Sequence, residues 1–280
     1  MSIAMQDVLA KQFSAEVKHK FQEKGVLRDT VRIRNIKGAK SVQFNLMGRG
    51  VAAERGAIQT PIPLMNVSHA PVVATVKDFT ASELTDVFLS NQVNFDERAE
   101  LVDTIANALG RRLDQVIIDA LVAANLSKTV AKDISGSEDN LTIAAIRAAA
   151  EQLDNDGVPD GDRTLVISPS GLHYLLKDNQ ASSADFNSVR ALVRGDLNTF
   201  YGFNIKKIGS REEGGLPLAT NDRTNFAYHR EAIGLALNMD VSVRIDFDEQ
   251  YGAHRVTGYL SAGAAVVDAL GAVKITTSEA

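Results

Sequence analysis

The feature that most constrains the fold is a long apolar stripe at helical spacing in residues 94–124. Asn94 can cap the first turn, and Asp96 and Glu97 favour a helix N-terminus. The stripe recurs every third or fourth position and comprises Leu101, Ile105, Leu109, Leu113, Val116, Ile117, Ala120 and Leu121. At about 1.5 Å per residue this helix is about 46 Å long, more than is typical of globular proteins. Gly110 is a mild weakness inside it.

Alternating patterns before this helix predict a long β-hairpin over residues 40–77. Val42, Phe44 and Leu46 lie on one side of its first strand, and strand character returns at residues 71–77. The segment between the strands contains residues that interrupt regular structure, namely Gly48, Gly50, Gly56, Pro61 and Pro63. Such a hairpin has little core of its own. We therefore expect it to dock on another subunit.

Residues after the long helix alternate between helical and strand patterns and predict a compact α/β lobe. The expected elements are helices at 142–154, 171–177 and 185–194 and strands at 164–167 and 203–208. A loop at residues 209–221 is expected to be exposed and mobile. Antiparallel strands follow at 241–248, 255–260 and 273–277. The order of hairpin, long helix, α/β lobe and strands predicts an α+β fold.

The N-terminal segment is basic, although the chain of 280 residues has a net charge of −5. Residues 1–40 hold nine Lys or Arg and four acids, which gives 9 − 4 = +5 and leaves −10 for the remainder. Residues 4–24 predict an amphipathic helix that Gly25 ends. The candidate basic residues are Lys18, Lys20, Lys24, Arg28, Arg32 and Arg34. They indicate either contact with nucleic acid or an acidic partner, or simply a solvated helix face.

Residue patterns for catalysis and metal binding are sparse. With no cysteine, thiolate metal sites and Cys nucleophiles are excluded, and five scattered histidines lack metal-ligand spacing. The acidic run of residues 154–162 resembles a loose calcium loop, but its spacing fails the calcium-loop pattern and no Glu closes it, so we predict a turn after a helix. Ser168 and Ser170 lie at a strand-to-helix junction where a nucleophile could lie, but we predict that one of them caps the helix. We expect no catalytic, cofactor or metal site, and neither a signal peptide nor a membrane span.

Taken in this order, the chain resembles the tailed-bacteriophage major capsid proteins of the Hong Kong ninety-seven-like fold, nearest to short-tailed T-seven-like podovirus coat proteins. The stretches that carry the likeness are 38–44 with Gly48 and Arg49, 157–163, 201–203, 229–234 and 263–275. The resemblance implies a capsid fold in four parts. These are an N-arm (1–37), an extended loop (38–80), a peripheral domain with a spine helix (81–130 and 226–280) and an α/β axial domain (131–225).

The resemblance also implies a function. The chain would be a structural subunit that self-assembles into pentamers and hexamers and forms an icosahedral capsid around a double-stranded DNA genome. It would be assembled in the host bacterial cytoplasm with a scaffolding protein and a portal, and with a decoration protein in some relatives. Arg49, Glu54 and Arg55 are the expected inter-subunit contacts, and the basic N-arm would face the interior. Two alternatives stay open: an encapsulin-type shell around a cargo enzyme, and an α/β enzyme that uses residues 131–225.

Overall fold

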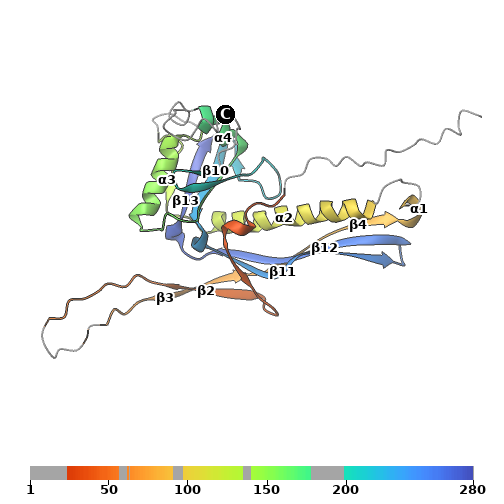
Figure 1. The fold of residues 1–280 in the computed structure, drawn as a ribbon, viewed down its shortest axis with the longest axis horizontal. Coiled ribbons are helices and arrows are strands. Elements are labelled where there is room, and N and C mark those ends of the chain that lie inside the picture. Colours follow the sequence, from red (N-terminus) through yellow and green to blue (C-terminus); the bar gives the residue numbers. More distant parts are fainter. Residues whose placement is uncertain are drawn as a thin grey trace, which may run out of the picture.

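The computed structural model describes residues 24–56, 62, 64–90, 97–134, 140–177 and 199–279. In this part of the chain an elongated lobe carries an α/β lobe at one end, and a hairpin projects beyond both (Figure 1). The predicted helices at 4–24 and 185–194 lie outside the described residues, apart from residue 24. No described helix is both long and apolar enough to cross a membrane.

The elongated lobe is a four-stranded sheet with a long helix along it (Figure 1). The strand order is β1 (Arg32–Asn35), β11 (Ile233–Asp248), β12 (Ala253–Val266) and β4 (Lys77–Asp86), and the short α1 (Val87–Ser90) follows β4. The helix is α2 (Glu97–Ala123), so the predicted stripe does form one helix. Gly258 lets α2 lie close to β12, because a Cβ there would be 2.4 Å from a methyl carbon of Ile105.

The α/β lobe is built around a second sheet. Its strand order is β5 (Thr129–Val130), β13 (Ala272–Ser278), β10 (Asp222–His229), β6 (Arg163–Ile167), β8 (Phe203–Lys207) and β7 (Thr199–Phe200), with β9 (Leu218–Ala219) paired to β10. Helices α3 (Ile143–Asn155) and α4 (Pro169–Lys177) belong to this lobe. The hydroxyl of Thr142 caps α3 by accepting from the Ala145 N–H. Three short 3-10 turns, η2 (Arg28–Thr30), η4 (Arg230–Ala232) and η5 (Ala269–Gly271), complete the described elements.

The two faces of the second sheet pack into different hydrophobic cores. Because one of these cores also contains α2, the sheet connects the α/β lobe to the elongated lobe. Leu165 and Val273 pack with the apolar residues of α3 and α4. Val166 follows Leu165 on β6, and Phe226 lies on the adjacent strand β10. Both belong to the core that also contains the buried stripe of α2. Alternation along each strand places successive side chains on opposite faces. The long helix therefore packs against both sheets.

The predicted hairpin consists of β2 (Ser41–Met47) and β3 (His69–Thr75), paired in register from Ser41↔Thr75 to Met47↔His69. Its base is docked on its own chain, because Val42, Phe44 and Ala74 pack with Ala236 and Val267. The ring of Phe44 lies over Gly234, where an added Cβ would be 2.6 Å from a ring carbon. The base of the hairpin is therefore fixed on its own subunit, and docking on another subunit stays a prediction for the distal part.

Two further expectations differ from the structure. The boundary expected between residues 225 and 226 falls inside β10, and β13 pairs with β10 and β5 in the sheet of the α/β lobe. The loop at 209–221 is not exposed throughout. Leu216 is buried, and the N–H of Gly214 donates to Oε1 of Gln115 on α2 at 2.7 Å. Packing against a distant helix overrides the turn-forming composition of this loop.

Candidate functional site

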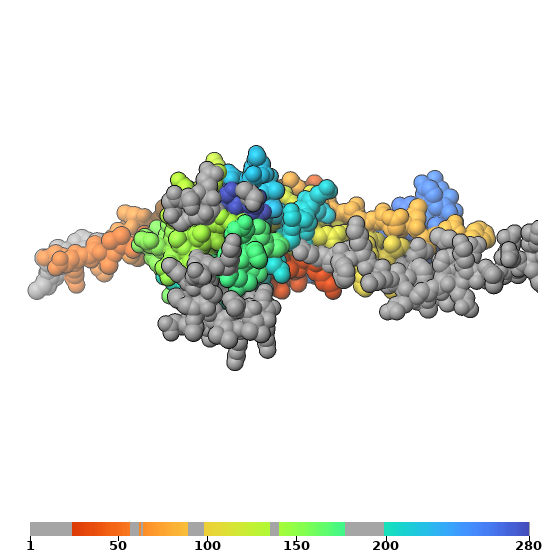
Figure 2. Space-filling model, turned by 90° about the horizontal axis from the view of Figure 1, so that it is seen from above, coloured from red at the N-terminus to blue at the C-terminus, as the bar shows by residue number. Residues whose placement is uncertain are grey.

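The distal part of the hairpin projects from the body and carries apolar side chains in solvent. Figure 2 shows this segment in orange, extending beyond the lobes. The backbone pairing ends where the N–H of Gly48 donates to the carbonyl oxygen of Ser68 at 2.8 Å. Beyond it, Val51, Ile62 and Leu64 are 78%, 80% and 82% exposed. Several apolar side chains left in solvent on one projecting segment are typical of an interaction surface.

The three predicted inter-subunit residues do not form one cluster. The guanidinium of Arg49 donates to the carbonyl oxygen of Asp156 in the α/β lobe of the same chain. That contact spans a cleft of about 410 Å³ between the hairpin and the lobe. Glu54 and Arg55 lie further along the tip and are exposed. Arg49 therefore braces the hairpin within the subunit, while the other two residues remain accessible.

The described part of the basic segment contacts its own chain. Arg28 forms an ion pair with Asp240, and Nη1 of Arg32 lies 3.2 Å from a carboxylate oxygen of Glu231. Nη1 of Arg34 donates to the carbonyl oxygen of Gln43 at 3.0 Å. Both ion pairs are exposed and therefore weak. Of the remaining candidates, Lys24 is exposed, and Lys18 and Lys20 lie outside the described residues.

A buried carboxylate that the sequence did not single out joins three segments at the middle of α2. Asp114, whose side chain is 1% exposed, accepts from the N–H groups of Val26 and Leu27 at 2.9 and 3.0 Å. It also accepts from Nη2 of Arg211 at 2.9 Å. Burial raises the pKa of Asp114, and the backbone donors and Arg211 oppose that rise. Its partners lie 88 and 97 residues away in sequence, so no local pattern could reveal it.

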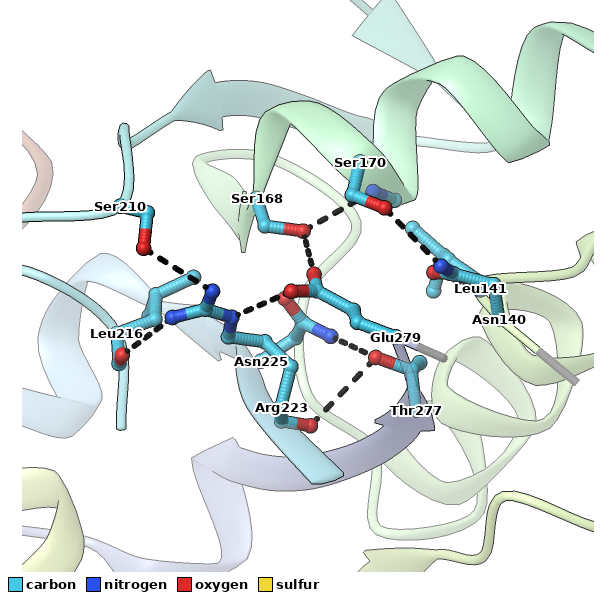
Figure 3. A network of polar contacts seen from close by, with 11 residues as sticks. Asn140, Leu141, Ser168, Ser170, Ser210, Leu216, Arg223, Asn225, Thr277 and Glu279 are labelled. Carbon is cyan, nitrogen blue, oxygen red and sulfur yellow. Dashed lines mark hydrogen bonds and ion pairs between the residues drawn. The ribbon is translucent and has the colours of Figure 1, made fainter. Parts of the chain in front are cut away.

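The hydroxyl of Ser168, a candidate nucleophile, lies in a network of polar side chains and has a structural role (Figure 3). Ser168 accepts from the Gly171 N–H at 3.0 Å, as a helix cap does, and its hydroxyl donates to Glu279. Glu279 in turn accepts from Nε of Arg223 at 2.9 Å. Nη1 of Arg223 donates to the carbonyl oxygen of Leu216 at 2.9 Å. The capping prediction is confirmed, and the network fastens β10, the end of β13 and α4 together.

The acidic run of residues 154–162 forms a turn held by an arginine. Nη2 of Arg163 lies 2.6 Å from Oδ1 of Asp154 and 3.0 Å from Oδ1 of Asp160. Gly157 has a φ of +67°, which the turn after α3 requires. No group of acidic or histidine side chains suited to a metal ion occurs among the described residues. The turn prediction for this run is confirmed.

The fold is similar to that of solved phage capsid proteins over nearly the whole chain. The capsid of cyanophage P-SCSP1u matches with a TM-score of 0.78 and 18% identity, covering 98% of this chain and 94% of that one. The head structure of Helicobacter pylori bacteriophage KHP40 matches with a TM-score of 0.80 and 11% identity, covering 100% and 99%. These likenesses confirm the predicted α+β capsid fold.

The sequence matches the phage capsid protein family over residues 5–279, and the chain belongs to that family. It is 21% identical over 248 residues to the major capsid protein of Escherichia phage T7, a match that covers 79% of this chain and 72% of that protein. Family membership assigns the chain to the structural proteins of the phage virion and not to the α/β enzymes.

Proposed function

We propose that this capsid subunit assembles into rings of five and six copies that close into an icosahedral shell around double-stranded DNA. The observation that carries the proposal is the hairpin tip, where Ile62 and Leu64 are 80% and 82% exposed. Covering such a surface stabilises an assembly, since apolar area removed from water is favourable by about 25 cal/mol per Å². In a closed shell the tip would lie on a neighbouring copy, with Glu54 and Arg55 at the rim of the contact.

The four-part division of the chain belongs to the same proposal, with its boundaries adjusted to the strands. Residues 1–37 would form the N-arm and 38–76 the extended loop. The peripheral domain would combine 77–128 with β11 and β12, and the axial domain would combine 129–229 with β13. Sheet membership supports this division, because β10 and β13 pair with each other and β13 pairs with β5.

Further partners of the shell are proposed from the same resemblance: a scaffolding protein, a portal and a decoration protein, with assembly in the cytoplasm of a host bacterium. The N-arm would face the interior and contact the scaffold first and DNA later. Because Arg28, Arg32 and Arg34 already contact their own chain, Lys18, Lys20 and Lys24 are the candidates for this role. Contacts of this kind weaken with salt, since screening acts over about 8 Å at physiological ionic strength.

Co-expression of the chain with the other head proteins encoded beside it tests the proposed function. We expect closed shells with five-fold and six-fold rings by electron microscopy. Sedimentation of the chain only as a monomer or small oligomer under these conditions would contradict the proposal. Reversal of Lys18, Lys20 and Lys24 to Glu is expected to lower the shell yield or scaffold retention, and raised salt should mimic the loss. A normal yield with full DNA packaging would leave those residues as a solvated helix face.

A further inference from the structure

The N-terminal segment joins the subunit body where it crosses the middle of α2. Gly25 lies so close to Gly110 that a Cβ on Gly25 would be 2.5 Å from the carbonyl oxygen of Gly110. The next residues are firmly packed, because Leu27 and Val31 are fully buried in the core of the elongated lobe. Thr30 adds a hydrogen bond of 2.7 Å between its hydroxyl and that of Tyr228. The two glycines thus permit a backbone crossing that a larger residue at position 25 would displace.

Asp114 lies one turn further along α2 and holds this crossing in place. One carboxylate accepts both the Val26 and the Leu27 N–H groups, which fixes the backbone on the body side of Gly25. Because the carboxylate is buried, its loss would leave these two donors and the Arg211 guanidinium short of an acceptor. No other side chain is bonded to the Val26 or Leu27 N–H among the described contacts. Asp114 therefore supplies the side-chain hydrogen bonds that hold the crossing, beside the packing of Leu27 and Val31.

Arg211 extends the same anchor to the α/β lobe. Its Nη1 donates to the carbonyl oxygen of Lys24 at 3.5 Å, and its Nε donates to that of Gly214 at 3.0 Å. Gly214 is also bonded to Gln115 and packs tightly on α2, since an added Cβ would be 2.5 Å from the carbonyl oxygen of Arg111. The hydrogen bonds of Asp114 and Arg211 consequently join helix α2, the loop at 209–221 and the N-terminal segment.

We propose that Asp114 is a positioning residue for assembly, which holds residues 24–27 in their path across α2 and beside the α/β lobe. In the proposed shell, this crossing fixes the point from which the N-arm starts. The anchoring is a property of the free subunit. Only its consequence for shell formation rests on the proposed function.

Hydrogen exchange on the free subunit tests the anchor directly. In Asp114→Asn, the exchange of the Val26 and Leu27 amides should rise by about tenfold or more, because the amide side chain offers one acceptor oxygen where the carboxylate uses two. The β6 amides should exchange as in the wild type. The matched control is Glu279→Gln, which neutralises another buried carboxylate bonded to an arginine, with side-chain exposures of 10% and 7% for Glu279 and Arg223. That variant should leave Val26 and Leu27 protected. Wild-type protection of both amides in Asp114→Asn would overturn the proposal.

Shell formation by the same variants tests the consequence. Asp114→Asn should give fewer closed shells than Glu279→Gln at a temperature equally far below each variant's melting point. Gly25→Ala displaces the crossing without changing any charge and should reproduce the defect, which keeps the test valid if Asp114→Asn fails to fold. Failure of the wild type to form shells would count against the proposed function alone. Normal shells from both Asp114→Asn and Gly25→Ala, with the wild type assembling, would refute the positioning role.

Discussion

The α/β lobe and the β2–β3 hairpin differ in where their stabilising contacts lie. In the lobe, Leu153, Leu165 and Phe203 are fully buried among residues of the lobe itself. In the hairpin, Phe44 is buried only because Ala236 and Val267 of other elements cover it, and the tip is left in solvent. One face of the lobe's sheet is therefore buried by the lobe itself, while the hairpin combines an anchored base with a tip suited to a surface outside the subunit.

Truncation of the lobe core should have the largest effect on subunit stability. Phe203→Ala removes a fully buried ring and should lower the free energy of unfolding by about 3–5 kcal/mol. Urea denaturation of the free subunit measures the loss. Tyr174→Ala, an aromatic residue of α4 that is 40% exposed, is the control and should cost much less. Equal losses in the two variants would mean that the lobe does not depend on its own core.

Overpacking the base of the hairpin should have an intermediate effect. In Gly234→Ala the added Cβ would collide with the Phe44 ring, so the base must shift at a cost of about 1–3 kcal/mol. Limited proteolysis should then cut the hairpin faster than in the wild type. Gly161→Ala, where an added Cβ meets nothing within 4 Å, is the control. An unchanged cleavage rate would show that the hairpin is not held through Phe44.

The effect of pH on subunit stability through Asp114 should be smaller than the effect of either substitution above. Burial raises the pKa of Asp114 above 3.8 in the folded subunit, so the folded state binds the proton more tightly than the unfolded chain. The stability of the wild type relative to Asp114→Asn should therefore grow as pH falls from neutral toward 3.8, and be lost as pH rises through the folded pKa. Melting temperatures of both proteins at constant ionic strength measure this difference. The opposite slope would show that the amides and Arg211 outweigh burial.

Polar substitution at the tip should have the smallest effect on the subunit and a clear effect on assembly. Ile62→Ser and Leu64→Ser together should change the free energy of unfolding by no more than about 0.5 kcal/mol each. The yield of closed shells should nevertheless fall. Leu218→Ser, at a residue of the α/β lobe that is 49% exposed, controls for loss of a surface leucine and should assemble normally. Normal assembly of the double variant would remove the functional distinction between the two regions.

Local patterns were sufficient for elements whose character depends on neighbours in sequence. The stripe from Leu101 to Leu121 predicts α2, and the alternation around Phe44 predicts β2, because side-chain spacing alone decides which face is buried. Strand partners were not predictable in this way. The alternation of residues 273–277 shows a strand but not that it pairs with β10, so the expected boundary at residue 225 crosses the sheet.

The same limit applies to the candidate site. The exposed tip follows from its glycines and prolines, which lie between two alternating strands. Gly25 and Gly110 were assigned to a helix end and a helix weakness, although the structure gives them a shared role as the point where two backbones cross. Arg49 was expected to contact another subunit, yet it contacts Asp156 of its own chain. Each of these features depends on contacts between residues far apart in sequence, which local spacing does not specify.

The position of β13 between β5 and β10 has a consequence for synthesis. Residues 272–278 are translated after every other strand of that sheet, so β5 lacks its only strand partner in the described sheet until they emerge. At about 5–20 residues per second, the ribosome takes roughly 7 to 28 seconds to pass from β5 to β13. The nascent lobe thus remains open through most of its translation. The base of the hairpin likewise waits for Ala236 and Val267, so the tip takes its place on the body only when the chain is nearly complete.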